Sequence, residues 1–148
     1  MHTSRNATRI AGVFSLIGII AGVLSIVYVI EEPDYLAKLP THESQVLVGA
    51  FFQLLMVPAY VGVALSLYPI LKDYNERLAL GFVGFRFVAA GFHLVGVIIL
   101  PLFVYLGREA LIAGPGELTY LRHLSELLRT TRDLSNHVGM ILAVTFGA

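Results

Sequence analysis

Two ionisable side chains stand inside a long apolar stretch of the chain, and their types allow chemistry there. Arg86 and His93 are seven residues apart, so a helix would place both on one face, which Ala89 and Gly96 continue. An ionisable group within a membrane-spanning helix is costly, which makes each a candidate functional residue. His93 could relay protons or bind a metal or haem, and the alternative is a hydrogen bond to a neighbouring helix. Arg86 could instead extend its side chain back to the membrane surface.

A further polar side chain, Gln53, lies inside another apolar stretch. Its amide needs a hydrogen-bonding partner there, and the simplest partner is a side chain on a neighbouring helix. Gln53, Arg86 and His93 together form the candidate intramembrane polar site.

A second cluster, Arg132, Asp133 and His137, precedes the last apolar run. Asp133 and His137 are four residues apart, so one helical turn could join them as a carboxylate–imidazole pair. Such pairs orient catalytic or metal-bound histidines, and they also anchor helix ends. We expect His137 near the membrane surface and His93 deeper, which argues against one haem bound by both. No recognisable nucleophile motif accompanies the cluster, and neither a metal site nor a cofactor is expected.

The composition is that of an integral membrane protein. Hydrophobic residues make up 57% of the 148 residues and charged residues only 14%, against roughly 25% charged in soluble domains. Ten basic and ten acidic side chains give no net charge, so nucleic-acid binding is not expected. Cysteine is absent, which excludes disulfides and cysteine-ligated metal centres.

The apolar runs predict an all-α fold: one polytopic transmembrane helical bundle over residues 1–148. Three runs are long enough for the ~20 residues that a full span requires. The last run is about twelve residues, or ~18 Å of helix, so we expect a truncated fourth span of a longer protein. The three full spans are expected at 10–30, 46–71 and 80–106, and the partial span at 137–148. An amphipathic interfacial helix is expected at 117–134.

The connections carry the charges. Residues 72–77 are a short polar link, which predicts that the helices on either side are antiparallel neighbours. Residues 31–44 form an acidic loop with one short helical turn expected around 35–39.

The count of basic residues alone leaves the orientation open, because the opposite side carries Lys38, Arg108, Arg122, Arg129 and Arg132. A cytoplasmic N-terminus, in a multi-pass chain of a bacterial inner membrane, is favoured by the acidic first loop and by the basic residues close to the first helix and the short link. These residues are Arg5, Arg9, Lys72 and Arg77.

Small residues form a seam along the first helix, which would let another backbone approach closely. The seam could pack against a helix of the same chain or form a contact between two copies. Its members are Ala11, Ser15, Gly18, Gly22 and Ser25.

Two strings of the sequence resemble a known family. TRIAGVFSLIGIIAGVLS in the first helix, followed by ALSLYPILKDYNERLALGFVGFR, is similar to the bacterial integral-membrane family named domain of unknown function 4386. The resemblance implies a compact bundle with further helices, and it implies no established activity. Where similar proteins carry an acidic residue in the third helix, this chain has Ala89 and Ala90 and then His93, which removes a carboxylate that could pair with an arginine.

These observations favour a non-enzymatic bundle that transports or senses a small solute or supports a partner membrane protein. The alternative is an intramembrane enzyme or a cofactor-binding protein that uses His93 or the Asp133–His137 pair. The lipid bilayer is the expected partner, and a second copy or another membrane protein is a further one to consider.

Overall fold

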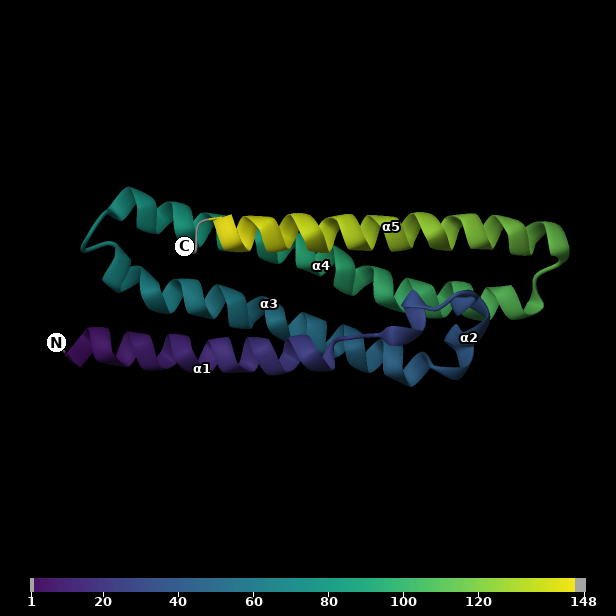
Figure 1. The fold of residues 1–148 in the computed structure, drawn as a ribbon, viewed down its shortest axis with the longest axis horizontal. Helices are drawn as coiled ribbons and strands as arrows, with labels where there is room; N and C mark the ends of the chain where they lie inside the picture. Colours follow the sequence, from purple (N-terminus) through teal and green to yellow (C-terminus); the bar gives the residue numbers. More distant parts are fainter. Residues whose placement is uncertain (1, 146–148) are drawn as a thin grey trace.

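The computed structural model describes residues 2–145, and within them the chain is helical without a strand (Figure 1). Three short helical turns separate the first two long helices: η1 (Tyr28–Glu31), α2 (Tyr35–Lys38) and η2 (Leu39–Thr41). The prediction of an all-helical bundle is confirmed. The four long helices are α1 (His2–Leu24), α3 (Glu43–Leu71), α4 (Glu76–Ile112) and α5 (Pro115–Thr145).

The long helices pack mainly on their neighbours in the sequence: α1 on α3, α3 on α4 and α4 on α5. Figure 1 shows them side by side as an antiparallel row. The short connections at 72–75 and 113–114 explain the last two of these pairs, because a turn of a few residues leaves the next helix nowhere to pack except against the one before it. The longer connection between α1 and α3 folds into the three helical turns. Asn75 starts α4 by accepting a hydrogen bond at its side-chain oxygen from the Leu78 amide, at 3.2 Å.

Three of the described helices, α1, α3 and α4, are long and apolar enough to cross a membrane. Their large apolar side chains point outward, as Ile19, Val23 and Ile98 do with nearly two thirds of their surface exposed. Such continuous exposure is costly in water and favourable in lipid. The helices therefore indicate association with the bilayer.

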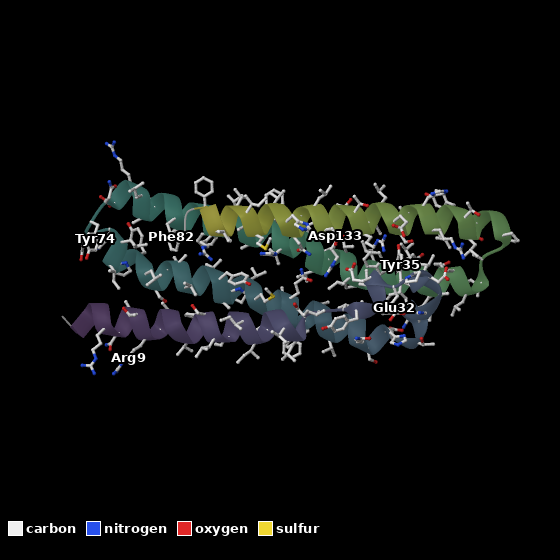
Figure 2. All side chains as sticks on the ribbon, in the orientation of Figure 1. Arg9, Glu32, Tyr35, Tyr74, Phe82 and Asp133 are labelled. Carbon is white, nitrogen blue, oxygen red and sulfur yellow. The ribbon has the colours of Figure 1, made fainter. Side chains whose placement is uncertain are left out.

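The buried hydrophobic core gathers at one end of the molecule, which we call the head. It joins the turns between α1 and α3 to the C-terminal part of α4 and the N-terminal part of α5. Figure 2 shows Glu32 and Tyr35 toward this end and Arg9 and Tyr74 toward the other. Glu31, Glu32 and Asp34 are exposed on the head, and charged side chains of this kind favour an aqueous surface. The fully buried side chains of the head include Ile30, Leu39, Leu100 and Phe103.

Tyr35 fixes α2 inside the head. Its ring meets Phe103 edge to face with centroids 5.9 Å apart, and its hydroxyl donates to Ser125 Oγ at 2.9 Å. Burial raises the pKa of the Tyr35 phenol, so this hydroxyl keeps its proton at neutral pH. At the head's surface, Lys38 pairs with Glu32, and its hydrogen bond lowers the pKa of that carboxyl.

The first helix ends at Leu24, six residues before the expected end at residue 30. Ser25 Oγ bonds back to the Gly22 carbonyl at 2.8 Å, and β-branched residues with low helix propensity follow. Val27, Val29 and Ile30 are buried in the head core instead. Packing in the head thus overrides the continuous apolar pattern. The expected turn at 35–39 is present as α2.

The segments 117–134 and 137–148, expected as separate helices, form the single helix α5 as far as Thr145, and residues 146–148 lie outside the described part. Residues 133–137 contain neither glycine nor proline, so nothing breaks the helix there. The apolar stripe of the amphipathic part packs on the head core through Leu121, Leu124 and Leu128. Protein, and not the membrane surface, therefore covers that stripe.

The small-residue seam of α1 packs against α3 of the same chain. A Cβ on Gly18 would lie 3.4 Å from the Tyr60 ring, and one on Gly22 would lie 3.5 Å from Met56 Cε. Ala11 is buried, whereas Ser15 is exposed. The seam serves an intrachain contact.

Candidate functional site

Gln53 of α3, His93 of α4 and Asn136 of α5 meet where the three helices come together, and we call them the polar layer. Gln53 Nε2 donates to Asn136 Oδ1 at 3.2 Å, and His93 lies beside Asn136, with which it lines the same cavities. A Cβ on Gly96 would lie 2.8 Å from Asn136 Oδ1 and 2.9 Å from Gln53 Nε2. The missing side chain of Gly96 is what allows the amides to meet. Asn136 is the partner that Gln53 needs.

The polar layer lies level with the last turns of α1. Ser25 Oγ contacts Met56 Sδ at 3.6 Å, and Gly18 packs against Tyr60, whose ring centroid is 5.8 Å from that of His93. The depth of His93 in the bilayer stays a prediction. At 37 residues, or about 55 Å, α4 exceeds the ~30 Å of hydrocarbon, so the position of His93 along the helix does not by itself fix its depth in the membrane.

A cavity of about 520 Å³ opens between α3, α4 and α5, and we call it the lateral groove. Its polar lining comes from Tyr60, Arg86, His93, Asn136 and His137. Its apolar lining comes from Met56, Met140, Ala143 and Val144. Two of the three predicted intramembrane residues therefore share one cavity, and Gln53 joins them through Asn136.

Arg86 brings a positive charge into this groove. Its guanidinium carbon lies 5.2 Å from the centroid of the Phe82 ring, a cation–π contact. Arg86 is one helical repeat of seven residues from His93, about 10 Å along the axis. Arg86 has no carboxylate partner among the described residues. The ion pairs there join Lys38 to Glu32, Arg108 to Glu43, Arg129 to Glu126 and Arg132 to Asp133.

The predicted Asp133–His137 pair is not formed. His137 Nδ1 lies 2.7 Å from the backbone carbonyl oxygen of Asp133, and the Asp133 carboxylate faces Arg132 at 3.6 Å. His137 instead lines the lateral groove together with His93. The two histidines were expected at different depths, and the continuous α5 brings them to one cavity. Within residues 2–145, no group of three histidine, aspartate or glutamate side chains is placed to hold a metal ion.

Arg132 lines a smaller cavity of about 240 Å³, which we call the interface cavity. Its side chain is only 12% exposed, and its Nε is buried without a hydrogen-bond partner in the described part of the chain. Gln53 Oε1 is likewise buried without a hydrogen-bond partner in the described part of the chain. The other lining residues are Ser25, Ile26, Val27, Glu31, Met56, His93 and Asn136.

Sequence reasoning missed Tyr60 and the role of Asn136. Gln53 and Tyr60 are seven residues apart in α3, the same spacing as Arg86 and His93 in α4. Matching polar faces on consecutive antiparallel helices were therefore a usable signal. Asn136 gave a weaker signal, because its partners become neighbours only through the packing of α5.

Comparisons with known proteins give a family and no activity. No curated protein and no solved structure matches the chain. The model of one family matches residues 10–148, nearly the whole chain. The chain belongs to that family, described as Domain of unknown function (DUF4386).

Proposed function

We propose that this protein binds a small anionic amphiphile, a carboxylate with an apolar tail, in the lateral groove as part of its transport or sensing. The observation that carries the proposal is Arg86, a cation without a carboxylate partner among the described residues, inside a largely apolar cavity. A cation at membrane depth is costly unless a counter-charge neutralises it. A ligand carboxylate provides that charge.

The remaining lining suits the two ends of such a ligand. Arginine binds carboxylates with two parallel hydrogen bonds, and Tyr60 and His93 supply further polar atoms in the same groove. Met56 and Met140 are flexible side chains that adapt to apolar tails of different shape. The volume of about 520 Å³ lies within the ~300–1,000 Å³ typical of ligand pockets.

We also propose that the protein is multi-pass in a bacterial inner membrane with its N-terminus in the cytoplasm. The start of α1 and the turn between α3 and α4 lie toward the same end of the bundle (Figure 1). That end carries Arg5, Arg9, Lys72 and Arg77 close to the apolar helices, which supports a cytoplasmic location. The acidic residues Glu31, Glu32 and Asp34 lie toward the opposite end, in and beside η1.

The charge of the ligand provides the first test. In lipid nanodiscs, a medium-chain carboxylate should bind about tenfold more tightly than the alcohol of the same chain length, because only the carboxylate forms charge-assisted hydrogen bonds with Arg86. Equilibrium displacement of a fluorescent fatty acid measures both affinities. Equal affinity for the acid and the alcohol would mean that the groove does not select an anion.

A further inference from the structure

We infer that the interface cavity is a water-filled vestibule that connects the aqueous side bearing the head with the lateral groove. The inference concerns access of water, so it does not depend on the identity of the ligand proposed above. Two buried polar atoms, the shared lining of two cavities and the charges at the mouth support it.

The two buried atoms are complementary. Gln53 Oε1 accepts hydrogen bonds and Arg132 Nε–H donates them, yet neither has a partner among the described residues. Both residues line the interface cavity, and Gln53 is only 6% exposed. Buried polar atoms are nearly always paired with protein or with ordered water. Water bound between them would satisfy both.

The cavity has the size and polarity that water requires. A water molecule occupies about 30 Å³ in the liquid and needs two to four polar partners. The volume of about 240 Å³ holds several molecules, and Glu31, His93 and Asn136 add polar atoms to the walls. A chain of waters can therefore extend through it.

The cavity lies between the surface of the head and the lateral groove. Toward the head, the lining includes Glu31, an exposed residue at the end of η1. Toward the bundle, the cavity shares Met56, His93 and Asn136 with the lateral groove. Because Ser25, the residue after α1, lines the same cavity as His93 and Asn136, water in the cavity would reach the polar layer from the head.

The absence of cysteine makes this testable on the full chain in lipid vesicles. We would introduce Gln53→Cys and treat it with a charged, membrane-impermeant methanethiosulfonate reagent. The matched control is Leu54→Cys, the next residue in α3, whose side chain is 46% exposed on the apolar surface. Glu32→Cys, exposed beside the head, marks the side from which the reagent enters.

We expect Gln53→Cys to react at least about tenfold faster than Leu54→Cys, because a thiol reacts as the thiolate and needs water. The reaction should occur only from the side on which Glu32→Cys reacts. Ser25→Cys is a second variant in the same cavity that leaves the polar layer intact, with Val23→Cys as its lipid-facing control. If Gln53→Cys and Ser25→Cys react as slowly as their controls, or only from the opposite side, the vestibule does not exist.

Discussion

Replacement of Arg86 by glutamine should weaken binding of the carboxylate amphiphile roughly 10- to 100-fold, because hydrogen bonds to a charged group contribute about 1.5–3 kcal/mol. Glutamine keeps a polar side chain of similar reach but loses the positive charge. The same fluorescent displacement in nanodiscs measures the change, and affinity for the alcohol should move much less. Such a pattern would separate loss of charge recognition from general damage to the groove.

Arg77→Gln is the matched control for this result. Arg77 lies in the first turn of the same helix, is exposed and does not line the lateral groove. Its replacement removes one positive charge from the protein without touching the groove, so affinity should stay within error of the unchanged chain. An equal loss in both variants would mean that net charge, and not Arg86, attracts the carboxylate.

Gly96→Ala should destabilise the bundle by about 1–3 kcal/mol, the usual cost of forcing extra atoms into a packed site. The new methyl group would lie within 3 Å of both amides of the polar layer, whose oxygen and nitrogen must then separate. Loss of the Gln53–Asn136 hydrogen bond adds to the cost. Thermal unfolding in one detergent measures the effect.

Gly91→Ala is the control in the same helix. A Cβ there meets nothing within 4 Å, and alanine is the better helix former by about 0.5–1 kcal/mol. The two substitutions should therefore shift the unfolding temperature in opposite directions. A fall of similar size in both would show that the polar layer adds nothing to the stability of the bundle.

The sequence was sufficient to predict the membrane helices because the requirement is simple. A span needs about 20 apolar residues, and uncharged runs of that length are visible by inspection. The ends of these helices were less predictable, because packing against protein in the head, and not the length of the apolar run, decides where they end. Gly107 shows the reason: a Cβ there would lie 2.7 Å from Leu39 Cβ, so α4 continues past its apolar run to pack against η2.

The sequence predicts which residues belong to the candidate site better than it predicts how they are arranged. Arg86, His93 and Gln53 attract attention because polar groups are rare in apolar helices. Their depth and partners depend on the registers of α3, α4 and α5, which local sequence does not encode. The His137 ring was assigned to Asp133 by spacing alone, whereas the backbone carbonyl one turn earlier satisfies it.

Photolabelling tests most directly the claim that the lateral groove binds an anionic amphiphile. A carboxylate with a photoreactive group in its tail would be irradiated with the protein in nanodiscs, and the labelled residues would be mapped by mass spectrometry. We expect label on Met56, Met140, Ala143 and Val144, and excess unlabelled carboxylate should remove it. Label spread over the outward-facing apolar residues of α1, such as Ile19 and Val23, and unaffected by competitor, would contradict it.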